Sequence, residues 1–187
     1  DVDEQVQVTR AEDYMRTGIL DYAREAVRRY GEQTFVLFGG VCGTWWGCTY
    51  YLGYMERFRC IREEPALVEY LSHRLLEDYL EQIRAFASAG GDAIYIDDAT
   101  STSDMISVGD YERFCLPYVR ELVAAIQALG QRAILIYSGG ITDRIGQIAS
   151  LDADGLICET SMKGYVNDLG EIAARLDGRT CLFGNMD

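Results

Sequence analysis

The sequence is poor in basic residues and in histidine, and it has no long apolar run. Seventeen Lys and Arg residues stand against 30 Asp and Glu residues, which gives a formal net charge of −13. Nucleic acid and anionic membranes would repel such a chain at long range, so neither is expected as a partner. No apolar run approaches the ~20 residues that cross a bilayer, and the opening DVDEQVQVTR has no signal-peptide pattern. The expected location is the cytoplasm.

Paired metal-ligand or disulfide spacings are also missing. The six cysteines contain no CxxC pair, and they stand at positions 42, 48, 60, 115, 158 and 181. We interpret them as reduced intracellular thiols. The only histidine, His73, falls inside a long amphipathic segment and is expected at the surface. Acid and base chemistry in this chain must therefore come from carboxylates or tyrosines.

Five short apolar runs rich in β-forming residues are present. They are typical of strands covered on both faces, and they lie at residues 34–40, 92–97, 132–138, 155–159 and 180–185. Longer amphipathic stretches separate them and predict helices. Thr9 and Glu12 have capping-box spacing and predict one helix to Gly31. The other predicted helices cover residues 65–89 and 114–129, a short turn from Thr142, and residues 169–176.

Alternating strands and helices predict a parallel sheet with right-handed crossovers. The first strand runs into GGVCGTWWGC and lacks the GxGxxG of a dinucleotide-binding fold. This favours a (β/α)₈ TIM barrel, an α/β fold. A whole barrel takes about 250 residues, so residues 1–187 are predicted to form a single partial barrel domain with five of the eight strands.

Two adjacent carboxylates, Asp97 and Asp98, end the second predicted strand. The sites of parallel α/β folds lie at the carboxyl ends of the strands, and side chains alternate between the two faces. We expect one aspartate to point into the barrel mouth, and we assign that role to Asp98. There it would orient an NH donor, accept a proton or hold a cation. The alternative is a loop-capping aspartate, and Asp104 is expected to be a turn residue.

Several motifs together resemble the uroporphyrinogen decarboxylase superfamily. They are Asp98 with the serine-rich ATSTSDMIS and YERFCLPY, the segment GGVCGTWWGCTYYL, and the closing GNMD. Their order along the chain is that of the family. The resemblance implies a TIM barrel whose third to seventh strands are present here, and it also implies that a homodimer is possible.

One branch of the superfamily decarboxylates a tetrapyrrole without a cofactor. Its tyrosine maps to Tyr51, or to Tyr50 if the register slips, and the resemblance implies that this hydroxyl positions a substrate carboxylate. The alternative is an aromatic wall around Trp46. Tetrapyrrole carboxylates would be repelled by the strand-end acids unless arginines outside this segment compensate.

The other branch transfers methyl groups between a corrinoid and an acceptor. The segment ICETS, which contains Glu159, resembles this branch more than the decarboxylases. Many of its members bind zinc through His-x-Cys-Gly, but this chain has Ile136, Tyr137, Ser138 and Gly139 there. Isoleucine cannot bind zinc and serine is a poor substitute for a thiolate, so no zinc site is expected.

The sequence thus predicts an enzyme of corrinoid-linked methyl transfer, with a corrinoid protein as partner and no covalently bound cofactor. Asp98, Glu159 and Tyr51 are the predicted catalytic residues. A small-molecule or tetrapyrrole substrate is expected to contact Trp46, Asp97, Tyr137, Asn185 and Asp187, and no metal ligand is predicted. Two alternatives stay open: uroporphyrinogen decarboxylation itself, and a non-catalytic barrel that binds a tetrapyrrole.

Overall fold

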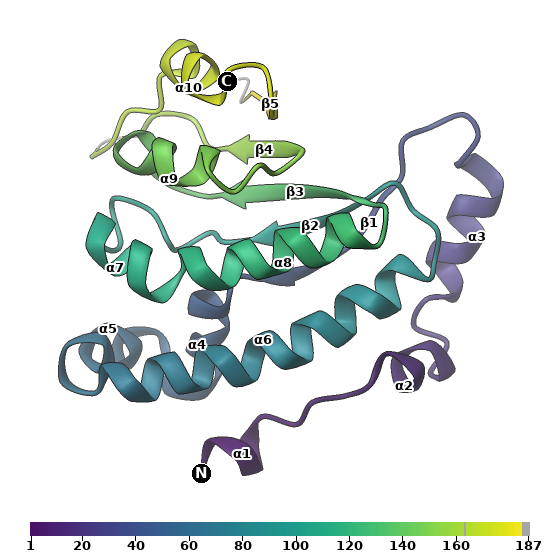
Figure 1. The fold of residues 1–187 in the computed structure, drawn as a ribbon, viewed down its shortest axis with the longest axis horizontal. Helices are drawn as coiled ribbons and strands as arrows, with labels where there is room; N and C mark the ends of the chain where they lie inside the picture. Colours follow the sequence, from purple (N-terminus) through teal and green to yellow (C-terminus); the bar gives the residue numbers. More distant parts are fainter. Residues whose placement is uncertain (163, 185–187) are drawn as a thin grey trace.

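Five parallel strands form one sheet in the computed structural model, which describes residues 1–162 and 164–184. All five predicted strands are confirmed, and they pair in the order of the sequence (Figure 1). Their bounds are β1 Leu37–Cys42, β2 Ala93–Asp97, β3 Arg132–Tyr137, β4 Gly155–Cys158 and β5 Cys181–Phe183. Asn185 and Asp187, two of the predicted substrate-binding residues, lie outside the described residues.

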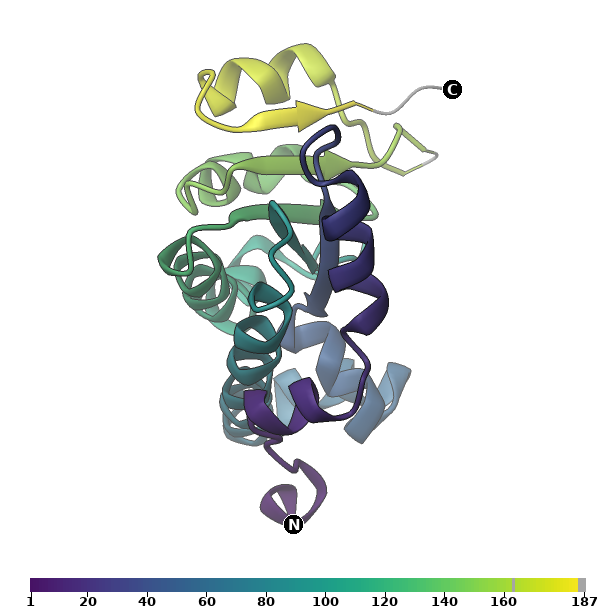
Figure 2. The ribbon, with the colours of Figure 1, turned by 90° about the vertical axis from the view of Figure 1, so that its right-hand side faces the viewer.

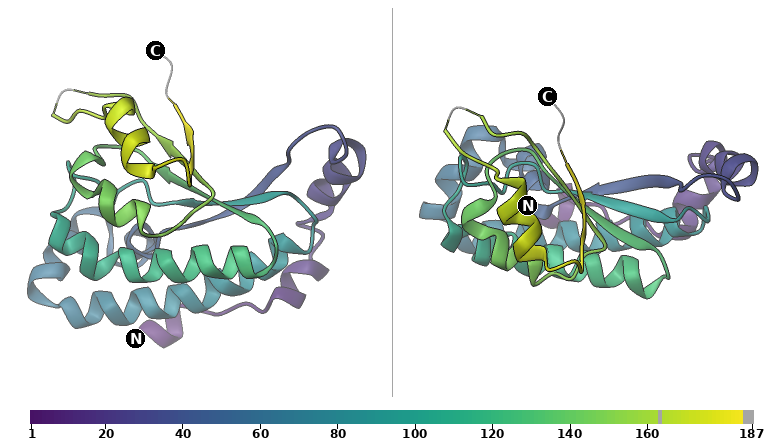
Figure 3. Two further views of the ribbon diagram at one scale, coloured as in Figure 1. Left: turned by 45° about the horizontal axis from the view of Figure 1, so that its top comes forward. Right: turned by 90° about the horizontal axis from the view of Figure 1, so that it is seen from above.

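The helices follow the strands in alternation. Their bounds are α1 Val2–Gln5, α2 Ala11–Arg16, α3 Asp21–Tyr30, α4 Thr44–Leu52, α5 Tyr54–Glu63, α6 Pro65–Ala87, α7 Val108–Phe114, α8 Leu116–Ala128, the 3₁₀ turn η1 Thr142–Arg144, α9 Ile145–Ala149 and α10 Leu169–Leu176. Helices α6, α8, α9 and α10 lie on one side of the sheet (Figure 3). No described helix is long and apolar enough to cross a membrane.

This topology is that of a barrel segment. A doubly wound sheet reverses its strand order at a switch point and carries helices on both faces. Here the order runs without reversal from β1 to β5, and the main crossover helices share one face. The chain is therefore an α/β structure consistent with a partial TIM barrel, as predicted.

The two faces of the sheet differ in their cover. On the covered face, Ile94, Ile96 and Leu135 are completely buried and join the core with helix residues such as Leu122. Because side chains alternate along a strand, their neighbours lie on the opposite face, which we call the open face. Strand pairing places five residues in one row across the open face: Cys42, Asp97, Ile136, Ile157 and Phe183.

The predicted helix over residues 9–31 is wrong as one piece. It divides into α2 and α3 at Gly18, whose φ of +77° is left-handed and ends a helix. The capping box is also wrong, because α2 begins after Arg10 and the Thr9 amide donates instead to Asp78 Oδ1 of α6, at 2.9 Å. Helix α2 packs against α6 (Figure 2).

The segment after β1 is helical, although no helix was predicted there. Helix α4 carries Gly47 at its contact with α6, where a Cβ would lie 2.3 Å from the Tyr79 hydroxyl oxygen. The glycine is there for close helix packing and does not mark a loop. Helix α6 has the predicted extent and begins with Pro65, and His73 is exposed on it, as predicted.

Candidate functional site

The carboxyl ends of the strands bring a thiol and a carboxylate together on the open face. Asp97 of β2 pairs in register with Cys42 of β1 and Ile136 of β3. It is half-buried, and its Oδ1 accepts a hydrogen bond from the Ala99 amide at 3.2 Å. Burial raises the pKa of Asp97 above its usual range. Burial, helped by the charges of Asp97 and Asp98, raises the pKa of the Cys42 thiol to about 11.

Asp98 points the other way. The pleat that directs Ile94 and Ile96 towards the helices directs Asp98 to the same covered face, and its exposed fraction is 0%. The inward orientation predicted for Asp98 is therefore wrong, and Asp97 occupies that position. Neither carboxylate oxygen of Asp98 accepts a hydrogen bond from any described residue. Burial raises the pKa of Asp98 to about 6, and the nearby Ser101 and Tyr137 side chains oppose that shift.

Tyr137 accompanies Asp98 beneath the sheet. Its exposed fraction is 1%, and its hydroxyl shares a hydrogen bond of 2.9 Å with the Tyr111 hydroxyl of α7. Tyr137 was expected to contact substrate, but the covered face of β3 holds it away from the open face. Burial raises the pKa of both phenols well above the usual range.

A buried arginine fixes the loop that follows Asp98. Arg144 has an exposed fraction of 0% and donates to the carbonyl oxygens of Ser101 and Ile106 at 2.9 and 2.8 Å. Its Nε donates to Asp143 at 2.9 Å, and its guanidinium lies over the Tyr111 ring. Arg144 is also a cation that favours ionisation of Asp98. Arg144 could not be recognised from the sequence, because a single arginine in a short turn gives no recognisable pattern.

Glu159 follows β4 and is half-buried at the same end of the sheet. Its Oε2 accepts a hydrogen bond from the Tyr165 hydroxyl at 2.9 Å. Burial and the Glu159 carboxylate raise the pKa of Tyr165 to about 12. The structure thus places Asp97 and Glu159 at the ends of strands separated only by β3.

Asn167, also missed from the sequence, joins the loops that follow β3 and β4. Its Nδ2 donates to the carbonyl oxygens of Gly139 and Glu159, each at 2.9 Å, and its Oδ1 accepts from the Ile141 amide at 3.0 Å. Its exposed fraction is 5%. One of these hydrogen bonds holds the backbone of Glu159, and the other two hold the backbone of Gly139 and Ile141 in the loop after β3.

A second buried arginine lies among aromatic rings beside the β2 loop. Arg57 of α5 has an exposed fraction of 0%, and its Nη1 donates to the Trp45 carbonyl at 3.1 Å and to Thr100 Oγ1 at 3.0 Å. The guanidinium carbon lies 4.6 to 5.3 Å from the ring centroids of Trp45, Phe58, Tyr54 and Trp46. Trp46, a predicted substrate-binding residue, is therefore part of this cage.

Tyr51, a predicted catalytic residue, lies on α4 with an exposed fraction of 38%. Burial and the charge of Asp78 on α6 raise its pKa. Among the described residues no hydrogen bond joins Tyr51 to Asp97 or Glu159. Its neighbour Tyr50 is more exposed, at 70%, and packs edge-on against Trp46.

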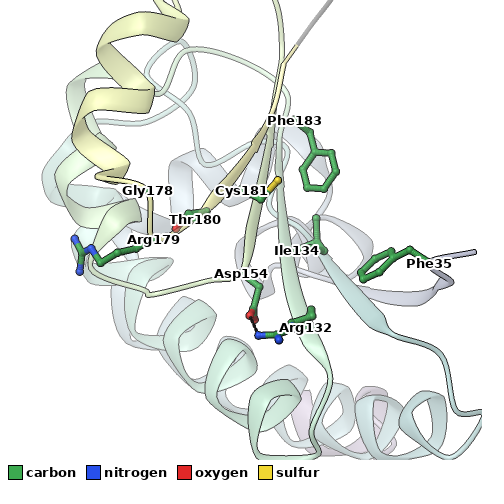
Figure 4. A pocket seen from close by; sticks show the side chains of 9 residues that line it. All are labelled: Phe35, Arg132, Ile134, Asp154, Gly178, Arg179, Thr180, Cys181 and Phe183. Carbon is green, nitrogen blue, oxygen red and sulfur yellow. Dashed lines mark hydrogen bonds and ion pairs between the residues drawn. The ribbon is translucent and has the colours of Figure 1, made fainter.

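A cavity of about 580 Å³ lies away from these carboxylates. It occupies the open face near the amino ends of β3, β4 and β5, where Ile134, Phe183 and Phe35 line it (Figure 4). Its polar groups include an ion pair of 2.7 Å between Arg132 and Asp154. This cavity marks uncovered barrel interior and not the end of the sheet at which Asp97 and Glu159 lie. No cluster of three or more metal-ligating side chains occurs among the described residues.

Comparison with known proteins identifies the family. The uroporphyrinogen decarboxylase (URO-D) family model matches residues 2–187. Uroporphyrinogen decarboxylase of Chlorobaculum tepidum is 30% identical over 63% of this chain and 33% of its own length. The enzyme of that name from Pelodictyon phaeoclathratiforme is 31% identical over 66% of this chain and 34% of its own.

A solved structure supports the fold. A methyltransferase from Methanosarcina mazei superimposes with a TM-score of 0.74 at 16% identity, covering 89% of this chain and 47% of the other. The match to the curated relatives spans about a third of their length. With the family model matched from residue 2 to residue 187, the chain belongs to the uroporphyrinogen decarboxylase family.

Proposed function

We propose that this chain is part of an enzyme that transfers a methyl group between a corrinoid and a small acceptor at the carboxyl ends of its strands. The observation that carries the proposal is the charge of this end of the sheet. Asp97 and Glu159 stand there, whereas Arg144 is engaged by backbone carbonyls, Arg62 is paired with Asp110 at 2.6 to 2.7 Å, and Arg57 is completely buried. A substrate with many carboxylates would meet repulsion in this place.

The two carboxylates supply the acid–base groups of the proposal. An acceptor that takes up a methyl group must lose a proton, and a half-buried carboxylate with a raised pKa is suited to receive it. Asp97 has both properties. Glu159, held through its backbone by Asn167 and through its side chain by Tyr165, is positioned to orient the acceptor.

The aromatic surface of α4 and α5 fits a flat ring system. Tyr50 and Tyr54 are 70% and 42% exposed, and Trp46, one ring of the Arg57 cage, packs against Tyr50. Exposed aromatic faces stack against planar ligands. When bound there, a corrinoid would supply or accept the methyl group. A corrinoid protein would be the partner, and a homodimer remains compatible with the proposal.

Decarboxylation of a tetrapyrrole is the second candidate. Its support is that the curated relatives at 30% and 31% identity carry the name uroporphyrinogen decarboxylase. The two functions separate in one experiment on the full-length protein. It would be supplied with methylcobalamin and a thiol acceptor, or with a porphyrinogen, and methylated thiol and carbon dioxide would be measured. Carbon dioxide release without methyl transfer would replace the proposed reaction by the second.

The site is tested by two neighbouring variants. We expect Asp97→Asn to lower turnover by at least 10²-fold, as for the loss of an acid–base group. Asp98→Asn, the matched variant on the covered face, should retain turnover within a few-fold. The reverse result would return the catalytic role to Asp98, which stays a prediction from the sequence.

A further inference from the structure

We infer that Arg57 binds the anionic group of a ligand, an oxyanion such as a carboxylate or sulfonate. This inference rests on the proposed function for its location, but its test does not require turnover. It starts from a buried guanidinium in which only one of the three nitrogen atoms donates hydrogen bonds. Nη1 makes both hydrogen bonds of the group, while Nε and Nη2 have no partner among the described residues.

The unused atoms form one edge of the guanidinium. Nε–H and one Nη2–H point in the same direction, and this pair is the fork that grips two oxygens of a carboxylate side by side. Nη1, on the far side, anchors the group to Trp45 and Thr100. Arg57 is thus fixed in position with its oxyanion-binding edge left free.

The charge of Arg57 also lacks a partner. Among the described ion pairs none involves Arg57, although the neighbouring Arg59 and Arg62 are both paired with carboxylates. Burial lowers the pKa of Arg57, but an arginine stays protonated in proteins. The four aromatic rings offset part of the cost of this buried cation, and an incoming anion would offset more.

Tyr54 is the most exposed of the four cage rings. Tyr54 is 42% exposed, its ring lies 4.9 Å from the guanidinium carbon, and its hydroxyl donates only to Met105 Sδ, at 3.5 Å. Gly53, immediately before it, has a φ of +89° and no side chain near its Cβ position. Rotation of Tyr54, which is not part of the buried core, would open the cage on the side of this ring.

The site is adjacent to the proposed reaction centre. Thr100, which receives a hydrogen bond from Arg57, is three residues beyond Asp97, and the Trp45 indole donates to the Thr100 carbonyl at 3.2 Å. One free fork fits one anionic group. The substrate class is then a small acceptor with a single carboxylate or sulfonate, and not a polycarboxylate.

Within this chain, tryptophan fluorescence reports on the Arg57 site, because the rings of both its tryptophans, Trp45 and Trp46, lie against the guanidinium. The experiment titrates the full-length protein with benzoate and with benzenesulfonate, and uses benzamide as the neutral probe of the same shape. We expect a saturable change with the anions and at least tenfold weaker binding of benzamide. Equal affinity for benzoate and benzamide would overturn the inference.

Variants then assign the effect to the guanidinium fork. Arg57→Lys keeps the charge but loses the fork, and we expect benzoate affinity to fall at least tenfold. Tyr54→Ala leaves Arg57 intact and removes the cover, and we expect faster association with unchanged anion preference. If the Arg57→Lys variant fails to fold, the Tyr54→Ala variant still tests the inference. Equal binding of benzoate and benzamide by Tyr54→Ala would show that Arg57 does not bind the anion. Anion binding without methyl transfer or decarboxylation would leave the inference standing and reject the proposed function alone.

Discussion

Gly43 lies directly against the carboxylate of Asp98, so that a Cβ on residue 43 would stand 2.1 Å from Asp98 Oδ1. Gly43 has φ −58° and ψ 143°, which any residue adopts, so the glycine is needed for space and not for its backbone conformation. We expect Gly43→Ala to lower the free energy of unfolding by about 1–3 kcal/mol, as overpacking does. Urea denaturation measures it.

The matched control is Gly109→Ala in α7, where a Cβ would meet nothing within 4 Å. An alanine inside a helix loses less entropy on folding than glycine, so this variant should gain up to about 1 kcal/mol. Equal stability of the two variants would contradict the close contact between Gly43 and Asp98.

Asp98 should make the protein less stable as the pH rises. Burial raises its pKa from 3.8 to about 6, so the folded state holds a proton that the unfolded chain has already released between these values. The contribution is fully present below about pH 4 and is lost as the pH rises through 6, with a total of ~3 kcal/mol. Asp98→Asn should flatten this part of the stability profile, measured by urea denaturation from pH 4 to 8. If the free energy of unfolding of the wild type rises from pH 4 to 8 in parallel with that of Asp98→Asn, the raised pKa of Asp98 is disproved.

Asn167 should control the order of the loops at the reaction centre. Asn167→Ala removes three side-chain hydrogen bonds, two of them buried, and leaves the Gly139 and Glu159 carbonyls and the Ile141 amide without them. We expect a loss of about 2–4 kcal/mol in the free energy of unfolding, because unpaired buried groups are costly.

Hydrogen exchange separates this local effect from general destabilisation. The Ile141 amide should exchange faster in Asn167→Ala than the core strand amides do. Gln147→Ala, which removes one exposed hydrogen bond to Glu112, should change neither quantity measurably. Unaltered protection of Ile141 in the Asn167 variant would mean that this loop is held by other contacts.

The sequence was sufficient for the strands and insufficient for the site. Each strand is a continuous apolar run, and burial on both sides of a barrel wall selects such runs directly. A continuous apolar run does not show which of its residues face the helices. The strand residues Ala93, Ile94, Tyr95 and Ile96 are all apolar or aromatic, so the local sequence does not predict the face on which Asp97 lies. Only packing of Ile94 and Ile96 against the helices decides it.

Missed residues share another cause. Arg57 and Asn167 act through hydrogen bonds to groups 12 to 43 positions away, and such contacts follow from tertiary placement and not from residue spacing. Gly18 and Gly47 show the converse problem. One breaks a helix with a left-handed φ, and the other lies within a helix and permits close packing. A glycine in a sequence does not reveal which of these roles it has.

Arg144 should set the acidity of Asp98 as well as hold its loop. The guanidinium favours the ionised form of Asp98 and donates to the Ser101 and Ile106 carbonyls. Arg144→Met removes both effects, so we expect the pKa of Asp98 to rise further. The fall in stability should then extend above pH 6, and stability at neutral pH should drop by about 3–5 kcal/mol, as when one partner is removed from a buried polar network. The double variant with Asp98→Asn separates the two roles. The double variant should lose the extended pH dependence and keep the destabilisation from the unpaired carbonyls. Equal pH profiles of Arg144→Met and the wild type would show that Arg144 acts on the loop alone.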